Sequence, residues 1–132
     1  MAGAVTNLLS GRMVPLPGEG QQVRDWVHVD DHCRGVALAL LEGETGAVYH
    51  IGGQELTNRE LTGMVRQACG AGPDRVVPVD EPPGYDRRQA LDDERIRQEL
   101  GYRPQVTLSE GLAATVQWYR DNEDWWRPLL PD

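Results

Sequence analysis

Leu56-Thr57-Asn58-Arg59-Glu60-Leu61 is the stretch that decides how the second half of the chain folds. Thr57 is a favourable helix N-cap residue, and Glu60, three positions later, can bond back to the backbone of the cap. The apolar residues that follow recur at helical spacing, and Gly70 is a typical helix stop. The stretch therefore predicts a helix that begins after Thr57, runs to about Cys69 and ends at Gly70.

Downstream of this helix, the pattern alternates between short strands and capped helices. Residues 76–79 and 88–91 are predicted as strands, separated by the rigid turn Pro82-Pro83-Gly84. Further helices are predicted over residues 92–101 and after a second capping box at residues 107–110. The second half is therefore a small α/β module of the order helix, strand, strand, helix and helix.

The first half of the chain consists of shorter elements. A helix is predicted over residues 2–10, followed over residues 12–22 by turns and a loop rich in proline and glycine that could contain a short extended segment. Residues 23–29 alternate β-branched or aromatic residues with polar ones, which predicts a strand. Residues 47–51 are predicted as another strand, which ends at Gly52-Gly53.

A helix without a polar face is predicted between these two strands. It runs from about His32 to Leu41, with Asp30 or Asp31 as its cap, and its residues from Val36 onward are all apolar. Helices of this kind are normally buried on several sides. We therefore expect this helix to be covered, although a domain of this size has few places that could cover it.

Composition excludes several classes of protein. The chain has 132 residues, enough for one domain over residues 1–132, and a formal net charge of -8. All 13 basic residues are arginines. Without a lysine, the chain lacks the lysine of a P-loop, the amine of a Schiff-base enzyme and the Tyr-x-x-x-Lys pair of short-chain dehydrogenases. The acidic balance argues against nucleic acid as a partner.

Nothing in the sequence indicates a membrane or a secretion route. No apolar run approaches the roughly 18 residues of a membrane-spanning helix, and no signal peptide is recognisable. We therefore expect a cytoplasmic protein with no membrane partner. Cys33 and Cys69 are far apart in apolar surroundings, and we expect two free, mostly buried thiols.

The residues that commonly perform catalysis are sparse. His28 and His32 flank a predicted helix start, and neither they nor His50 belong to a cluster of metal ligands, so no metal site is expected. Ser10 and Ser109 are not part of a nucleophile elbow. No Gly-x-Gly-x-x-Gly fingerprint follows a strand, so dinucleotide binding by that device is not expected. We assign no catalytic residue to this chain.

The arginines are the strongest candidates for binding. Arg24 lies in the first half, and Arg87 and Arg88 follow the Pro-Pro-Gly turn. An arginine presents a planar fork that suits phosphate oxygens. Asn58 lies in the first turn of a capped helix, where free backbone N–H groups and the helix dipole favour an anion. Arg24 and Asn58 could therefore converge on a diphosphate.

These residues also have an ordinary structural explanation. Arg24 could form an ion pair with Asp25 or Glu19, and Asn58 could serve only the helix cap. Exposed ion pairs are common and contribute about 0–1 kcal/mol each. Spacing alone favours this structural explanation over a diphosphate site.

Six stretches carry a family resemblance and together cover nearly the whole chain. They are Gln22-Val23-Arg24-Asp25-Trp26-Val27-His28-Val29-Asp30-Asp31-His32, Tyr49-His50-Ile51-Gly52-Gly53, Leu56-Thr57-Asn58-Arg59-Glu60-Leu61, Gly84-Tyr85-Asp86-Arg87-Arg88, Glu99-Leu100-Gly101-Tyr102-Arg103-Pro104 and Val116-Gln117-Trp118-Tyr119. In this order and at this spacing they resemble the dTDP-glucose 4,6-dehydratases, a branch of the extended short-chain dehydrogenase/reductases. More distant epimerases and decarboxylases of sugar nucleotides share only parts of the pattern.

The resemblance implies both a fold and an incomplete enzyme. Members of the family oxidise the sugar at C4, eliminate water across C5–C6 and return the hydride to C6. Their NAD-binding Rossmann domain, Tyr-x-x-x-Lys pair and acidic dehydration residues lie in the N-terminal part. This sequence resembles only the last two-fifths. It implies a small mixed α/β domain of about four helices and short strands that binds a sugar nucleotide, is inactive alone and itself holds no NAD.

The resemblance also implies a binding site. By position, Arg24 and Asn58 match the family residues that hold the diphosphate of the nucleotide. Tyr85 and Arg87 belong to a matching motif and are further candidate substrate-binding residues.

Three positions depart from the family pattern. Pro17 stands where the family usually has a tyrosine beside the thymine base, Pro82 replaces an arginine directed at the phosphates, and Tyr85 replaces a histidine near the nucleotide. Losing an arginine–phosphate contact costs about 1.5–3 kcal/mol. We therefore expect weakened binding of a dTDP-sugar, or binding of another nucleotide.

The apolar helix is explained by the same resemblance. In the family, the segment of about residues 25–53 crosses back and packs on the Rossmann domain. Because large exposed apolar patches are rare in monomers, we expect a homo-oligomer or a separate Rossmann-containing chain as partner. The alternative function is a non-catalytic interaction or scaffold protein that kept the fold and lost the ligand.

Overall fold

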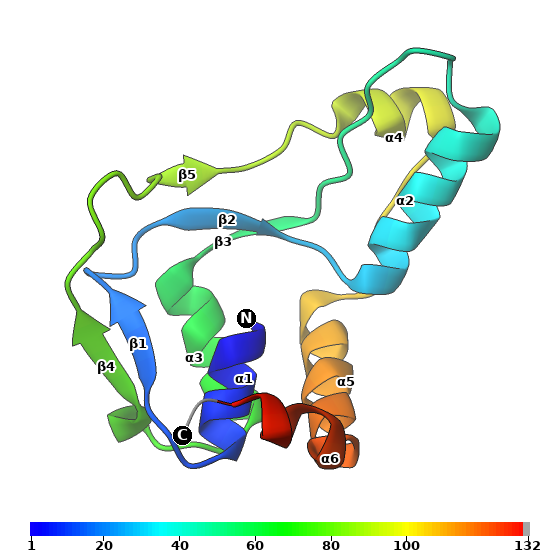
Figure 1. Ribbon diagram of the computed structural model, residues 1–132. Helices are drawn as coiled ribbons and strands as arrows, with labels where there is room; N and C mark the ends of the chain where they lie inside the picture. The colour runs from blue at the N-terminus through cyan, green and yellow to red at the C-terminus, as the bar shows by residue number, and fades with distance from the viewer. Residues whose placement is uncertain (131–132) are drawn as a thin grey trace.

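The computed structural model describes residues 1–130, which form a mixed α/β fold (Figure 1). Its α-helices are α1 (Ala2–Leu9), α2 (Val29–Glu42), α3 (Asn58–Ala68), α4 (Glu94–Leu100), α5 (Leu108–Asp121) and α6 (Glu123–Trp126). Its strands are β1 (Val14–Pro17), β2 (Val23–Trp26), β3 (Gln54–Thr57), β4 (Val76–Val79) and β5 (Arg88–Gln89). Two short 3-10 helices, η1 (Pro73–Arg75) and η2 (Arg127–Leu129), complete the described elements.

The strands form two small sheets. β1 pairs in parallel with β4, with Val14 opposite Val76. In the second sheet, β2 is central, antiparallel to β3 and parallel to β5. Arg24 in β2 lies opposite Leu56 in β3. Leu56 stands two residues before Asn58, the first residue of α3. The pairing therefore brings Arg24 close to the start of this helix.

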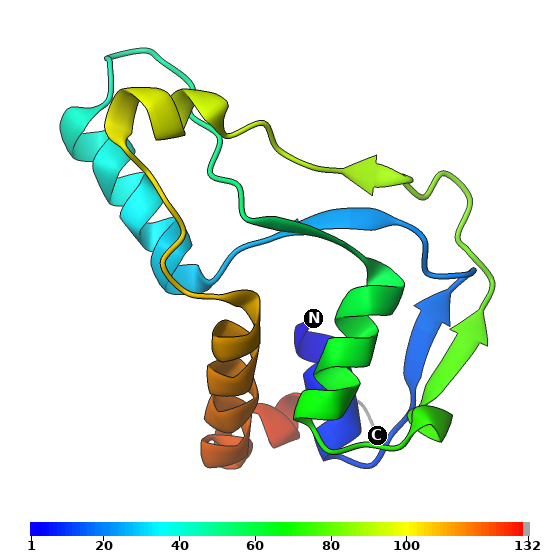
Figure 2. The same ribbon diagram turned by 180° about the vertical axis from the view of Figure 1, so that it is seen from behind.

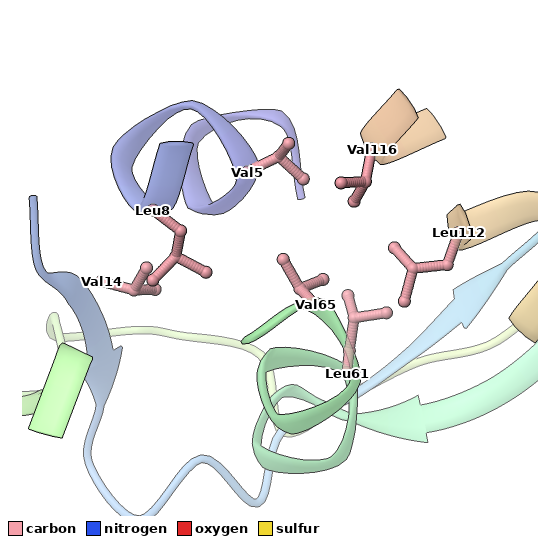
Figure 3. Close-up of a cluster of buried hydrophobic side chains, with 7 residues drawn as sticks. All are labelled: Val5, Leu8, Val14, Leu61, Val65, Leu112 and Val116. Atoms are coloured by element: carbon pink, nitrogen blue, oxygen red, sulfur yellow. The ribbon is translucent and has the colours of Figure 1, made fainter. Parts of the chain in front are cut away.

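The hydrophobic core lies between α1, α3 and α5. Figure 3 shows the side chains of these helices pointing toward one another, with Val14 of β1 beside them. The buried cluster consists of Val5, Leu8, Val14, Leu61, Val65, Leu112 and Val116. Each helix contributes residues spaced three or four apart, the spacing that puts side chains on one helical face. The capping boxes at Thr57 and Thr107 both form, and they set where α3 and α5 begin.

α2 and α4 pack together at the opposite end of the central sheet from this core (Figures 1 and 2). The fully buried Asp31 of α2 holds this end in place. Its carboxylate accepts hydrogen bonds from the backbone N–H groups of Gln105 (2.9 Å) and Val106 (3.0 Å), and it pairs with Arg34. The Tyr102 hydroxyl donates to the carbonyl of Gly52 at 3.2 Å.

The structure corrects the prediction for α2 in two respects. The helix begins at Val29, and its cap is His28, whose Nδ1 accepts from the N–H of Asp30. Asp31 is unavailable as a cap because it binds the chain before α5. The helix is also not covered on several sides, since Leu40 is 81% and Leu41 79% exposed. Its apolar residues have too few neighbours within the described chain.

The strand predicted over residues 47–51 is wrong. These residues form no regular ladder, and the strand instead begins at Gln54 of β3. A strand needs a neighbour to take its backbone hydrogen bonds, and among residues 1–130 none pairs with residues 47–51. β2, by contrast, lies beside β3 and pairs with it.

Two smaller predictions are also corrected. Six α-helices form within residues 1–130 rather than about four, because α6, which packs through the buried Trp126, adds to the five helical segments predicted above. Both cysteines are free, but Cys33 is exposed and Cys69 only half-buried. Cys33 is exposed because it lies on α2, away from the core. No helix of the described residues is long and apolar enough to cross a membrane.

The two capping boxes predict a loss of stability in acid. Backbone and hydroxyl hydrogen bonds from Thr57 lower the pKa of Glu60 below its ordinary value of 4.5, and those from Thr107 do the same for Glu110. Carboxylates with a lowered pKa stabilise the fold above pH 4.5, and this contribution is lost as the pH falls through the lowered values. We expect the urea concentration at the unfolding midpoint to decrease as the pH is lowered below 4.5. In a Glu60→Gln/Glu110→Gln variant, this decrease should be less steep. Identical pH dependence in both proteins would contradict this.

Candidate functional site

A cleft of about 570 Å³ opens between β1, β2, α1 and α3. Its lining includes Pro17 of β1, Arg24 and Trp26 of β2, and Asn58 of α3. Tyr85, from the turn before β5, also lines it. β2 is the central strand of its sheet, and the start of α3 bonds through Asn58 and Arg59 to the carbonyls of Gln22 and Gly20, which precede that strand. The cleft brings together residues that are separated by more than 60 positions in the sequence.

Arg24 is available to a ligand in this cleft. One guanidinium nitrogen donates to the carbonyl of Val23 at 2.7 Å, and the guanidinium carbon lies 5.1 Å from the centre of the Tyr85 ring. Within residues 1–130, Arg24 forms no ion pair with Asp25 or Glu19, so the part of the structural explanation that concerns Arg24 is wrong. Asp25 instead accepts from the N–H groups of Gly53 (2.6 Å) and Leu91 (3.3 Å).

The start of α3 differs from the expected anion site. The N–H of Asn58 donates to the carbonyl of Gln22, and that of Arg59 to the carbonyl of Gly20, both at 2.9 Å. The N–H of Glu60 donates to the Thr57 hydroxyl. The prediction of free backbone N–H groups here is therefore wrong. What Asn58 can offer the cleft is its side-chain amide.

Gln22 is the residue of this site that the sequence analysis missed. Its side chain is only 4% exposed and lies between the carbonyl of Pro17 and the amide of Asn58. A signal was present, since residues two apart on a strand share a face. Gln22 directly precedes β2 and stands two residues before Arg24, which lines the cleft.

The other candidate residues divide between the cleft and the surface. Tyr85 is in the cleft, where its ring supports the guanidinium of Arg24 and is 38% exposed. Pro17 also lines it, at the end of β1. Arg87 and Pro82 are exposed and do not belong to the lining, and the Arg87 carbonyl accepts from the N–H of Val23. The structure thus brings together Arg24, Asn58 and Tyr85, but not Arg87.

The described residues contain no cluster of metal-ligand type. Among residues 1–130, no group of three or more His, Cys, Asp or Glu side chains could hold a metal ion. α2 and α3 begin at side-chain caps: His28 accepts from the N–H of Asp30, and Thr57 accepts from the N–H of Glu60.

The fold defines a class, namely that of a partial region of an extended short-chain dehydrogenase/reductase. The chain belongs to the family described as GDP-mannose 4,6 dehydratase, whose model matches residues 1–115. Its curated relatives include the dTDP-glucose 4,6-dehydratase of Streptomyces antibioticus, 57% identical over 95% of this chain. The corresponding protein of Escherichia coli is 36% identical over 92% of the chain.

Solved structures agree with the fold. The crystal structure of the dTDP-glucose 4,6-dehydratase of Streptomyces venezuelae, with NAD and TYD bound, is 54% identical and has a TM-score of 0.93 over 98% of this chain. The UDP-glucose 4-epimerase of Thermotoga maritima, with UDP-glucose, is 32% identical with a TM-score of 0.85 over 92% of the chain. The chain spans 38% of the Streptomyces antibioticus relative, 41% of the Streptomyces venezuelae structure and 39% of the epimerase structure. It therefore matches a partial region of these enzymes.

Proposed function

We propose that this chain is the nucleotide-sugar-binding portion of a dTDP-glucose 4,6-dehydratase and that it is catalytically incomplete by itself. The observation that carries the proposal is the position of Arg24, which lies in the cleft without a carboxylate partner among residues 1–130. A cation that is half-buried and unpaired favours an anionic ligand. The 4,6-dehydratase relatives support a dTDP-hexose as that ligand.

The residues of the cleft have separate roles in this proposal. The planar guanidinium group of Arg24 donates hydrogen bonds to the diphosphate, and the Asn58 amide donates a further one. Tyr85 holds the guanidinium of Arg24 against its ring. Pro17 provides an apolar surface beside the base but no hydroxyl, which is consistent with binding weaker than in the relatives. Arg87 lies too far out to join them and stays a candidate from sequence alone.

Calorimetric titration of the chain with dTDP tests the proposal. We expect saturable binding, with thymidine binding more weakly because it lacks the diphosphate that Arg24 and Asn58 would hold. Inorganic pyrophosphate should compete with dTDP for the same reason. If the folded chain shows no heat and no chemical-shift change with millimolar dTDP, the alternative scaffold function is favoured and the binding proposal is wrong.

We further propose that the segment of residues 25–53 packs against a separate Rossmann-containing chain or a second copy of this chain. α2 exposes Val36, Leu40 and Leu41, with 48%, 81% and 79% of their surface accessible. A cavity of about 680 Å³ lies beside it, lined by residues from the starts of α2 and α5 such as Val29 and Leu108. Apolar surface of this extent is typical of an interface.

This proposal predicts self-association of the isolated chain. We expect sedimentation velocity to show dimers or larger species at high concentration, driven by the apolar surface of α2. A Leu40→Glu/Leu41→Glu variant should shift the population toward monomer, because two carboxylates would lie in the contact. Leu91→Glu is the matched control, since it charges an exposed leucine outside α2. A wild-type chain that stays monomeric at high concentration would contradict the prediction.

Location and cofactor follow from the same proposal. We propose a cytoplasmic protein, in keeping with the biosynthetic enzymes that it resembles. NAD would be held by the partner half and not by the residues of this chain.

A further inference from the structure

We infer that Gln22 is a positioning residue that sets which end of the Asn58 amide faces the nucleotide. The inference deepens the proposed function and rests on it. It begins from the observation that Gln22 is a buried polar side chain, 4% exposed, and that both ends of its amide are engaged, one of them by the cleft residue Asn58.

The direction of the hydrogen bonds is determined at Pro17. Its carbonyl can only accept, so the Gln22 amide turns its Nε2 toward it, at 3.4 Å. The Oε1 atom of Gln22 then faces Asn58 and accepts from Asn58 Nδ2 at 3.3 Å. If the Asn58 amide were reversed, two carbonyl oxygens would face each other. The Pro17 carbonyl therefore fixes the orientation of the Gln22 amide, and the Gln22 amide in turn fixes that of the Asn58 amide, with Asn58 Nδ2 as the donor.

The consequence concerns the charge of the ligand. An amide nitrogen carries two N–H groups, and Gln22 uses one of them. The second has no partner among residues 1–130, and we assign it to a ligand in the cleft that Asn58 lines. A reversed amide would offer an oxygen, which repels phosphate oxygens. Because the backbone N–H groups at the start of α3 are already used, the orientation of this one amide decides whether α3 contributes to anion binding at all.

Gln22 also fixes the position of the Asn58 backbone, in addition to the orientation of the Asn58 side-chain amide. The Gln22 carbonyl accepts from the backbone N–H of Asn58 at 2.9 Å. The same residue therefore binds Asn58 through its main chain and its side chain. A substitution of the Gln22 side chain leaves the main-chain bond in place, so the amide orientation can be changed while α3 stays anchored.

A double-mutant cycle tests the inference. The four proteins are the wild-type chain, Gln22→Met, Asn58→Ala and the double variant, and the measurement is the dissociation constant for dTDP. Methionine keeps the length of glutamine and removes both hydrogen bonds. We expect Gln22→Met to weaken dTDP binding about three- to tenfold, the effect of a lost hydrogen bond. In the Asn58→Ala background, the same substitution should have no further effect.

Two further measurements separate positioning from a general structural role. Thymidine binding, followed by chemical shifts, should be the same in the wild type and Gln22→Met, because thymidine carries no phosphate. The Asn58 side-chain amide signals, assigned by their loss in Asn58→Ala, should shift with dTDP in the wild type and much less in Gln22→Met. If Gln22→Met does not fold, NOE contacts between the Asn58 amide protons and the Gln22 side chain in the wild type decide the same question, and their absence would overturn the inference.

The outcomes are distinguishable. Equal weakening by Gln22→Met in both backgrounds, or an unchanged dissociation constant for the single variant, would overturn the role of Gln22 and leave the proposed function intact. Parallel weakening of thymidine and dTDP would overturn it as well. If the wild-type chain itself does not bind dTDP, the proposed function fails, and this inference fails with it.

Discussion

An Arg24→Ala variant is expected to bind dTDP about 10- to 100-fold more weakly than the wild-type chain. A hydrogen bond to a charged group contributes about 1.5–3 kcal/mol, and 1.4 kcal/mol is a factor of ten in affinity. Arg24 supplies such a bond from the cleft, where it has no carboxylate partner within residues 1–130. Isothermal titration calorimetry of the two proteins under one set of salt conditions measures the difference.

Two further variants show whether the effect comes from the site. Arg24→Lys keeps the charge but lacks the planar fork, so it should fall between the wild type and Arg24→Ala. Arg127→Ala removes the same charge from η2, outside the cleft, where Arg127 pairs with Glu123, and it should bind like the wild type. If Arg127→Ala weakens binding as much as Arg24→Ala, net charge rather than the cleft determines affinity.

An Asp31→Ala variant is expected to lose about 3–5 kcal/mol of unfolding free energy. The substitution removes the fully buried carboxylate that accepts from the backbone N–H groups of Gln105 and Val106, and it leaves Arg34 without its partner. Each unsatisfied buried group costs about 1–3 kcal/mol. Urea denaturation followed by circular dichroism measures the loss.

Because α2 and α4 lie apart from the α1–α3–α5 core (Figure 1), the loss should be concentrated there. Hydrogen exchange should speed up most in α2 and around residues 105–106. Asp30→Ala is the control, because the Asp30 side chain is 73% exposed, and we expect it to cost less than 1 kcal/mol. A similar cost for both variants would show that Asp31 does not anchor α2.

Local signals predicted much of this fold correctly. The boundaries of α3 and α5 follow from two capping boxes, whose bonds are formed between residues three apart. β4 was predicted residue for residue, and Gly101 ends α4 with the positive φ of 67° expected for a C-terminal glycine. These features depend on neighbours in sequence, so the sequence contains the information that determines them.

The errors share a different cause. Residues 47–51 have the composition of a strand, and the exposed side of α2 has the composition of a buried face. Within residues 1–130, however, no strand pairs with residues 47–51 and no segment covers Leu40 and Leu41 of α2. Asp31 was taken as a possible helix cap because it stands near the start of α2. Its actual partners, Gln105 and Val106, are 74 and 75 residues away, and no local pattern indicates them.

The candidate site divides in the same way. Arg24 and Asn58 were identified from residue type and family resemblance, and the structure brings them into one cleft with Tyr85. The two hydrogen bonds that link Pro17, Gln22 and Asn58 were not predicted, because they join three segments that meet only in the folded chain. The exclusion of Arg87 from the cleft also needed the structure.

The sequence by itself determined the helix starts, the two glycine stops beside Cys69 and Leu100, and the family to which the motifs point. It could do so because caps, turns and motifs are made by residues within a few positions of each other. Only the tertiary structure decided which donors at the start of α3 remain free, which arginine meets the cleft and which apolar surface stays uncovered. Those properties depend on contacts between segments that are distant in the sequence. Such contacts determine which hydrogen-bonding groups are already used and which side chains are buried, and no local pattern indicates them.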